Sequence, residues 1–485
     1  MASPPRTPPR VIPIAPAADD SAAMVSLYEK QPKVYPRSVS GVFARWRWIM
    51  VWLTQLVFYG VPWLQWDGRQ AVLFDLVERR FHLFGLVLQP QDLIFLAALL
   101  VISALALFFF TAVAGRLWCG YACPQTVYTE IFLWIERRIE GDRLARMQLD
   151  AAPWSARKLA RKGGKHAAWI AVSLFTGFTF VGYFTPVRVL LAELATWSLS
   201  PWETFWVLFY GFATYGNAGF LREQICKYMC PYARFQSTLI DADSLVIAYD
   251  AARGEARGSR SRKADAKALG LGDCIDCTLC VQVCPTGIDI RNGLQNECIG
   301  CAACIDVCDD VMGKMGYAPG LIRYATDNGV RHGWTRAQML RRVLRPRVLV
   351  YGALLLALSV AFVVAIALRS GHTVDVLRDR GALARLVDGG HVENVYRLQI
   401  ANRGASAQRY RVDAGGLPGL VLAGDAEIVV GPYVAGMLAV RLTLPPETAQ
   451  SLASGAHPIE FRVRRAGDGA PGETVRAAST FYVPR

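Results

Sequence analysis

Two cysteine-rich runs lie close together in the chain: CIDCTLCVQVCP at residues 274–285 and CIGCAACIDVC at residues 298–308. Both have the spacing C-x2-C-x2-C-x3-C. Closely spaced thiolates suit a cubane iron–sulfur cluster, because each iron at a corner takes one sulfur ligand. A single tight loop cannot easily surround all four corners, so each cluster is expected to take its fourth cysteine from the other run.

The two runs therefore predict two 4Fe–4S clusters with a crossed set of ligands. The first cluster site is expected to consist of Cys274, Cys277, Cys280 and Cys308, and the second of Cys298, Cys301, Cys304 and Cys284. Two zinc sites are the alternative, since C-x2-C pairs also bind zinc, but two complete runs argue against them. Cys308 is followed by Asp309 instead of proline, which leaves the ligand set intact.

A different cysteine pattern occurs twice nearer the N-terminus: WCGYACPQT at 118–126 and ICKYMCPYA at 225–233. Each is a C-x3-C-P motif. Proline favours the first position of a helix, so Cys123 and Cys230 are expected to cap helices that begin at the following proline. A thiol at a helix N-terminus has a lowered pKa and is partly ionised.

The four cysteines of these motifs, Cys119, Cys123, Cys226 and Cys230, are referred to below as the C-x3-C-P thiols. Soft sulfur ligands near a membrane surface suit Cu(I), zinc or dithiol redox chemistry. Met229 and either Met312 or Met315 are candidates for additional thioether ligands. Ordinary buried cysteines are the alternative, although two copies in matching positions argue against it.

The composition places these motifs in a membrane protein. The chain has 485 residues, of which 53% are hydrophobic and only 19% charged, compared with about 25% charged in soluble domains. Five stretches are long and apolar enough to cross a bilayer. They are residues 46–65, 93–114, 167–187, 203–220 and 348–368. The fourth is short and contains Asn217, so a buried amphipathic helix is the alternative there.

The basic residues orient these stretches. Lys and Arg are frequent before the first stretch and between the second and third, and this bias marks cytoplasmic loops. The N-terminus is therefore expected in the cytoplasm and the C-terminus outside. The enrichment of Lys and Arg in cytoplasmic loops accounts for the net charge of +14, so nucleic acid is not expected as a partner. All twelve cysteines are expected on the reducing side, where metal and redox roles are favoured over disulfides.

The remaining segments complete the predicted architecture. Residues 1–27 are rich in Pro and Ala and are expected to be disordered. Residues 372–485 contain short alternating runs separated by turn residues, which predict an antiparallel β-sandwich outside the cytoplasmic membrane. Its three histidines, His372, His391 and His457, are expected at the surface.

The sequence resembles the cytochrome c oxidase accessory proteins of the CcoG family, also called FixG or RdxA. The resemblance runs over nearly the whole chain from about Lys33. It rests on KVYPRSVSG (33–41), RRFHLFGLVLQPQD (79–92), WCGYACPQTVYTEIFLWIER (118–137), REQICKYMCPYARFQSTLIDADSL (222–245), both ferredoxin runs and CDDVMGKMGYAPGLIRYAT (308–326).

The resemblance implies five spans, a two-cluster ferredoxin-like module and an immunoglobulin-like domain. The expected segments are a cytoplasmic disordered, basic tail (1–45), four transmembrane helices (46–220), a cytoplasmic ferredoxin module (221–347), a fifth transmembrane helix (348–368) and a periplasmic sandwich (372–485). A bacterial inner-membrane location and partnership with copper chaperones or oxidase assembly factors are implied with them.

The implied activity is reduction of Cu(II) to Cu(I) for assembly of a cbb-type oxidase. The eight ferredoxin cysteines would hold the clusters, and the C-x3-C-P thiols would receive copper or pass electrons to it. A quinol-oxidising electron-transfer subunit and a non-enzymatic copper chaperone are the competing hypotheses. Arg222 and Glu223 are expected to form a boundary ion pair, with a quinone head-group site as the alternative. The electron donor, a cytoplasmic reductant or quinol, is left open.

Overall fold

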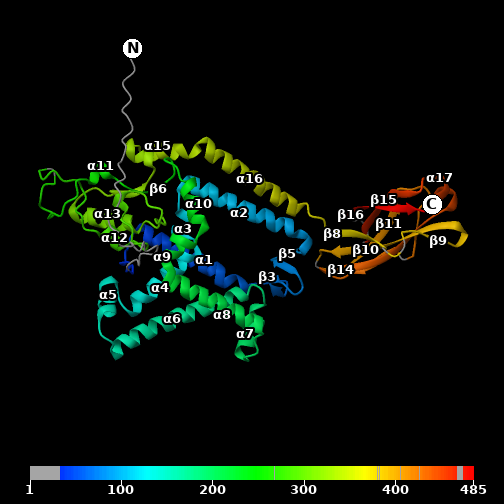
Figure 1. The fold of residues 1–485 in the computed structure, drawn as a ribbon, viewed down its shortest axis with the longest axis horizontal. Coiled ribbons are helices and arrows are strands. Elements are labelled where there is room, and N and C mark those ends of the chain that lie inside the picture. Colours follow the sequence, from blue (N-terminus) through cyan, green and yellow to red (C-terminus); the bar gives the residue numbers. More distant parts are fainter. Residues whose placement is uncertain are drawn as a thin grey trace, which may run out of the picture.

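The computed structural model describes residues 33–484, except residues 267, 380, 382, 405, 425 and 467–472. The predicted disordered stretch at 1–27 lies outside these residues. Figure 1 shows three parts along one long axis: a ferredoxin module at one end, a β-sandwich at the other, and helices between them.

The N-terminal half is mainly helical. Its helices are α1 (Val42–Gly60), α2 (Leu93–Ala114), α3 (Leu117–Tyr121), α4 (Pro124–Ile139), α5 (Arg143–Ala151), α6 (Ala156–Val181), α7 (Val187–Ala195), α8 (Pro201–Gly216), α9 (Arg222–Gln224) and α10 (Pro231–Leu239). Five short strands follow α1: β1 (Gln65–Trp66), β2 (Arg69–Gln70), β3 (Val72–Asp75), β4 (Arg80–Leu83) and β5 (Leu86–Leu88). β3, β4 and β5 form one antiparallel sheet.

Two helices of the described chain, α2 and α16 (Pro346–Ala367), are long and apolar enough to cross a membrane. The two helices pack against each other, and no residue in the most apolar stretch of either is buried. Figure 1 places the ferredoxin module and the sandwich at opposite ends of this helix pair. An exposed apolar surface of this kind indicates association with a membrane.

Two of the five predicted spans are therefore confirmed, those at residues 93–114 and 348–368. The other three stretches are helical, but α6 has Arg157, Lys158, Arg161, Lys162 and Lys165 in its first turns and α8 has only 16 residues. A bilayer core requires about 20 apolar residues. α1 has 19 residues and includes Arg45 and Arg47.

The ferredoxin module contains short elements around the cysteine runs. They are β6 (Val246–Tyr249), α11 (Ala251–Gly254), α12 (Leu279–Gln282), α13 (Ala303–Met315), β7 (Ile322–Ala325), α14 (Asp327–Arg331) and α15 (Arg336–Arg341). β6 pairs antiparallel with β7. α12 and α13 each begin inside a cysteine run, so the third cysteine of each run lies in the first turn of a helix.

Residues 33–41 differ from the tail expected over residues 1–45, because they pack along α5 and the ferredoxin module. The Tyr35 hydroxyl donates to Asp150 at 2.6 Å, and the Ser38 hydroxyl donates to Asp142 at 2.8 Å. The backbone N–H of Arg37 donates to the Gln282 carbonyl oxygen in the first cysteine run at 2.8 Å. Hydrogen bonds from several side chains thus fix this segment against two parts of the fold.

The C-terminal domain is a two-sheet sandwich, as the sequence predicts. Its strands are β8 (His372–Arg378), β9 (Arg385–Val387), β10 (His391–Asn402), β11 (Gln408–Gly415), β12 (Val421–Ala423), β13 (Glu427–Val430), β14 (Ala435–Leu444), β15 (Gly455–Ala466) and β16 (Thr474–Val483), with one short helix, α17 (Pro446–Ser451). One sheet has the order β12-β14-β10-β8, with β9 beside β10, and the other β13-β11-β15-β16.

The sandwich core follows the alternation of its strands. Tyr396, Leu398 and Ile400, alternate residues of β10, are fully buried between the sheets. The prediction of a surface position was wrong for His372, which is 2% exposed, packs on the Tyr410 ring and contacts the Val463 carbonyl oxygen through Nε2 at 3.2 Å. Its position as the first residue of β8, paired with Asn402, places it in the core.

Candidate functional site

The two cysteine runs adopt the same backbone at equivalent positions. Thr278 and Ala302, each directly after the second cysteine of its run, have φ values of 55° and 59°. Asp276 and Gly300, each directly before that cysteine, have φ values of 51° and 70°. Positive φ is uncommon for residues other than glycine. Its occurrence at equivalent positions shows that the two runs share one backbone conformation.

Each run encloses a cavity at the position where a cluster is expected. A cavity of about 370 Å³ is lined by Cys274, Cys277, Cys280 and Cys308. A second cavity of about 340 Å³ is lined by Cys284, Cys298, Cys301 and Cys304, with Cys280 between the two. The chain thus brings together the two crossed groups that the spacing predicts, and four cysteine sulfurs around a shared space fit a 4Fe–4S group. Ligation by individual cysteines stays a prediction.

Burial controls the acidity of these thiols. It raises the pKa of Cys280 to about 11 and that of Cys298 and Cys308 to about 12. The pKa of Cys304 is raised well above its usual value by burial and by the neighbouring cysteines. Thiols in this environment stay protonated at neutral pH until a metal displaces the proton, so loading with iron releases protons.

The C-x3-C-P motifs begin helices as predicted. Cys123 is the N-cap of α4 and Cys230 the N-cap of α10, and each is followed by a proline in the first helical position. The prediction of a lowered pKa was wrong for Cys123. Burial raises its pKa, and this effect outweighs the backbone N–H groups of Gln125 and Thr126, which lower it.

The C-x3-C-P thiols gather in one place although they come from two distant segments. Cys226 interacts electrostatically with the other three, and Cys119 with Cys123 and Cys230. Burial raises the pKa of Cys119 to about 11 and that of Cys226 to about 12. Among the described residues, no group of three or more His, Cys, Asp or Glu side chains is arranged to hold a single metal ion.

The methionines suggested as further ligands lie elsewhere or face outward. Met312 is 2% exposed and lines the cavity of the first cluster site, and Met315 packs against the same core. The Met229 side chain is 64% exposed. Sequence spacing identifies a methionine near a cysteine motif, but only the fold decides which side chains face it.

The first C-x3-C-P motif packs directly against the second cysteine run. A Cβ added at Gly120 would lie 2.7 Å from the Gly300 carbonyl oxygen, so only glycine permits this approach. Cys119 and Cys226 also pack against the small core that contains Ile299 and Cys301. The C-x3-C-P thiols are therefore adjacent to the second cluster site.

Arg116 fixes the three cysteine segments to one another. Its guanidinium donates to the Ala233 carbonyl oxygen after the second C-x3-C-P motif at 3.0 Å. The same group donates to the Cys298 carbonyl oxygen at 3.3 Å and to the Asn296 carbonyl oxygen. This role is not visible in the sequence, where an arginine beside an apolar stretch looks the same as a basic residue that only orients the chain in the membrane.

The predicted ion pair at Arg222 exists with a different partner. Arg222 pairs with Glu136 on α4 at 2.8 Å, and Arg146 on α5 pairs with the same carboxylate at 2.6 Å. Glu136 is 3% exposed, and the two guanidinium groups hold its pKa below its usual value against the effect of burial. This network joins the segment before Cys226 to α4.

Two π-helical turns, η3 (Asn217–Leu221) and η4 (Ile225–Met229), flank Arg222. Such turns are frequent at functional sites.

Comparisons with known proteins extend this picture. A family model of a 4Fe-4S dicluster domain matches residues 221–327, and one of a 4Fe-4S binding domain matches residues 96–141. A third model, the IG-like fold at the C-terminus of FixG, matches residues 362–484. The fold and the two cysteine-lined cavities thus define a membrane-associated iron–sulfur electron-transfer protein.

The chain is similar over most of its length to three curated proteins. Protein RdxA of Cereibacter sphaeroides is 39% identical over 93% of this chain and 98% of the relative. Nitrogen fixation protein FixG of Rhizobium meliloti is 39% identical over 86% of this chain and 88% of the relative, and protein RdxB of Cereibacter sphaeroides is 40% identical over 80% and 83%. The chain belongs to the FixG/RdxA family.

Proposed function

We propose that this protein is a cupric reductase that supplies Cu(I) for assembly of a cbb-type cytochrome oxidase. The observation that carries the proposal is the contact between the C-x3-C-P thiols and the second cluster site, through Gly120 and Gly300 and through the packing of Cys119 and Cys226. A soft four-sulfur group beside an electron carrier suits a soft, one-electron metal ion.

The chain's own residues have two tasks in this reaction. The ferredoxin cysteines hold the clusters, which supply one electron at a time when bound. The C-x3-C-P thiols receive Cu(II) as substrate and, because thiolates bind Cu(I) more favourably than harder ligands do, they stabilise the product. One electron per copper ion converts Cu(II) to Cu(I), and the buried thiols release protons as they bind the metal.

We also propose a five-span topology with the clusters in the cytoplasm and the sandwich in the periplasm, in which α1, α6 and α8 cross the membrane beside α2 and α16 although they are shorter or more basic than those two. The large exposed apolar side chains of α1 and α8 support it. They include Trp46, Ile49, Trp52, Leu53, Leu56 and Val57 on α1, and Trp202, Phe205, Leu208, Phe209 and Phe212 on α8. Apolar faces of this extent require lipid or another protein surface.

Replacement of two thiols tests the copper assignment. In the Cys226→Ser/Cys230→Ser variant, Cu(II) reduction by the chemically reduced protein should be lost, whereas iron content and cluster absorbance should match the parent protein. Cys298→Ser should instead lower the iron content and the cluster absorbance, because it removes a predicted ligand of the second cluster. Undiminished copper reduction by the double variant would refute the assignment of copper to these thiols.

A further inference from the structure

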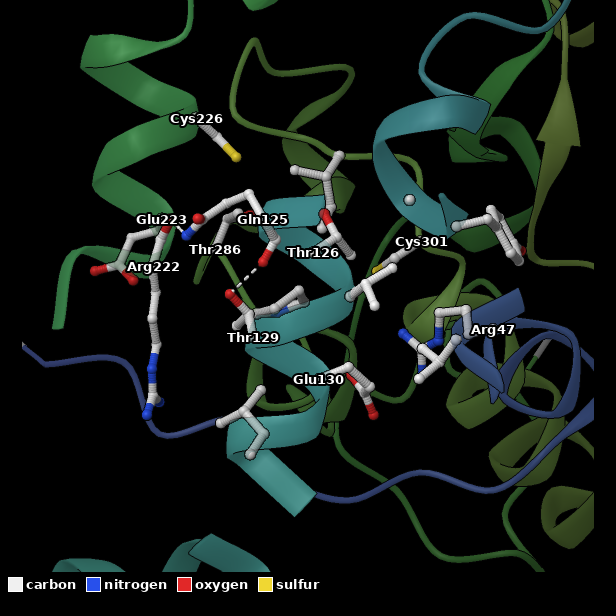
Figure 2. A pocket seen from close by; sticks show the side chains of 17 residues that line it. Arg47, Gln125, Thr126, Thr129, Glu130, Arg222, Glu223, Cys226, Thr286 and Cys301 are labelled. Carbon is white, nitrogen blue, oxygen red and sulfur yellow. Dashed lines mark hydrogen bonds between the residues drawn. The ribbon is translucent and has the colours of Figure 1, made fainter. Parts of the chain in front are cut away.

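A cavity lies where α1, α4 and the second C-x3-C-P motif meet the ferredoxin module. It encloses about 570 Å³, including space open to solvent. Figure 2 shows Cys301, Arg47 and Glu130 at one end of this cavity and Cys226 and Glu223 at the other. A molecule bound there would lie beside a cysteine of the second cluster site.

Arg47 gives this cavity an unsatisfied hydrogen-bond donor. It is 7% exposed, and its Nε has no hydrogen-bond partner among the described residues. A buried donor without a partner costs free energy, which a ligand oxygen would recover. In Figure 2 the Arg47 side chain lies beside Cys301 and Glu130, and all three line the cavity.

Glu130 supplies an acceptor at the same end. Its carboxylate lies 3.5 Å from the Arg137 guanidinium on α4, and the side chain is 16% exposed. Arg47 and Glu130 also line a smaller adjoining cavity, which reaches Pro36 and Arg37 of the N-terminal segment. Glu130 thus borders both cavities, and its side chain is not fully closed off from solvent.

The rest of the wall is mixed. Val51, Leu133 and Ile299 are apolar, and the polar or charged lining residues include Gln125, Thr126, Thr129, Thr286, Arg222 and Glu223. Cavities that combine apolar walls with converging polar groups are typical of sites for small organic ligands. The sequence has no glycine-rich phosphate-binding motif after a strand, which a dinucleotide would be expected to need. The cavity meets α1 at Arg47 and Val51 on its buried face, and other positions of the same helix expose Trp and Leu side chains. The site thus lies beside an apolar surface from which a lipid-soluble ligand would approach.

We propose that this cavity binds the head group of a membrane quinol and that the quinol is the electron donor. Its hydroxyl groups need an acceptor and its oxidised carbonyl needs a donor, the roles that Glu130 and Arg47 offer. Oxidation to the quinone releases two electrons and two protons. Glu130 would accept the protons one at a time and pass each to solvent, and the clusters that the ferredoxin cysteines would hold could take up one electron each. The inference deepens the proposed function by naming its reductant, but binding itself does not depend on copper.

Binding is measured with 2-heptyl-4-hydroxyquinoline N-oxide, a fluorescent quinol analogue whose emission is quenched in quinol sites. The cluster-loaded protein in detergent should give saturable quenching, and excess decylubiquinone should reverse it. Arg47→Gln and Glu130→Gln should each raise the dissociation constant at least tenfold. Arg138→Gln, which makes the same charge change as Arg47→Gln at an exposed position of α4, should leave it unchanged.

A second readout does not depend on the folding of one variant. Anaerobic decylubiquinol should bleach the cluster absorbance of the parent protein, and Glu130→Gln should slow this at least tenfold while dithionite still reduces the same clusters. Val51→Phe places a larger side chain in the cavity and keeps Arg47 and Glu130. This variant should also weaken analogue binding at least tenfold.

Failure of this inference is distinguishable from failure of the proposed function. Quenching that does not saturate, quenching unaltered in all three cavity variants, or reduction by NADH but not by quinol would overturn the quinol site. Reduction of Cu(II) by dithionite-treated protein would leave the cupric reductase standing in each case. Saturable analogue binding without any copper reduction would support the quinol site and refute the reductase.

Discussion

Gly120 in the first C-x3-C-P motif lies against Gly300 in the second cysteine run, with only 2.7 Å between a Cβ built at Gly120 and the Gly300 carbonyl oxygen. This contact joins the proposed copper thiols to the second cluster site. Because the neighbour is backbone, a side chain at residue 120 must move one segment away from the other.

Gly120→Ala should therefore slow copper reduction by the reduced protein about tenfold or more, since small displacements of reacting groups have large effects on rate. Iron content should stay at the parent level. Gly163→Ala is the matched control, because Gly163 lies within α6 and has no atom within 4 Å of a built Cβ. An unaltered rate in Gly120→Ala would show that the contact is not needed for electron transfer.

Asp306 connects the helix of the second cysteine run to the start of α1. Its carboxylate accepts from the backbone N–H groups of Phe43 at 3.1 Å and Ala44 at 2.7 Å. Asp306→Ala should lower the free energy of unfolding by about 1–2 kcal/mol, as removal of a helix cap does.

Thermal unfolding measures this effect, with Asp310→Ala on the same helix as the control. Asp310 pairs with Lys314 in an exposed i,i+4 contact, so its loss should cost less than about 0.5 kcal/mol. Equal destabilisation by the two variants would contradict a capping role for Asp306.

Glu136 should make stability depend on pH at the acidic end. Its pKa is below the usual value in the folded protein, so the carboxylate contributes stability above its unfolded pKa, near 4.5. This contribution is lost as the pH falls through the lower, folded value. Glu136→Gln leaves Arg146 and Arg222 without their shared buried partner, and should cost about 3–5 kcal/mol at pH 7.

Unfolding midpoints between pH 3 and pH 7 check this prediction. The difference between the parent protein and Glu136→Gln should be largest at pH 7 and should shrink below pH 4.5. A constant difference over this range would mean that the variant acts through packing and not through the charge of Glu136.

Iron content distinguishes a two-cluster protein from one in which the C-x3-C-P thiols also hold a cluster. Two clusters correspond to about eight irons per chain. Cys308→Ser should remove the first cluster and Cys284→Ser the second, each leaving about four irons, because each cysteine belongs to the opposite run. About twelve irons in the parent protein would contradict the copper assignment, because the C-x3-C-P thiols would then hold a third cluster. This outcome is worth measuring because a family model of a 4Fe-4S binding domain covers Cys119 and Cys123.

The sequence predicts the grouping of the cysteines and the starts of their helices, because both depend on short spacing. Cysteine intervals indicate the grouping of Cys308 with the first run, and proline after Cys123 indicates the start of α4. Positions decided by tertiary contacts are different. The burial of His372, the cap from Asp306 and the role of Arg116 each depend on a partner far along the chain.

The acidity of Cys123 illustrates the same limit. Its position at a helix N-terminus predicts a lowered pKa, but burial in the assembled site has the larger effect and raises it. The spans show a related limit, because only those at α2 and α16 are confirmed. Apolar stretches in α1, α6 and α8 are recognisable, but the basic turns of α6 and the length of α8 are set by the complete helices.

The most direct test of the central claim is an anaerobic single-turnover measurement. The protein is reduced, freed of reductant and mixed with Cu(II) in the presence of a Cu(I)-specific chelator. We expect cluster absorbance to recover as one Cu(I) appears for each electron lost, up to two per chain. Clusters that stay reduced while Cu(II) is present would contradict the reductase, and tight Cu(I) binding without turnover would indicate a chaperone instead.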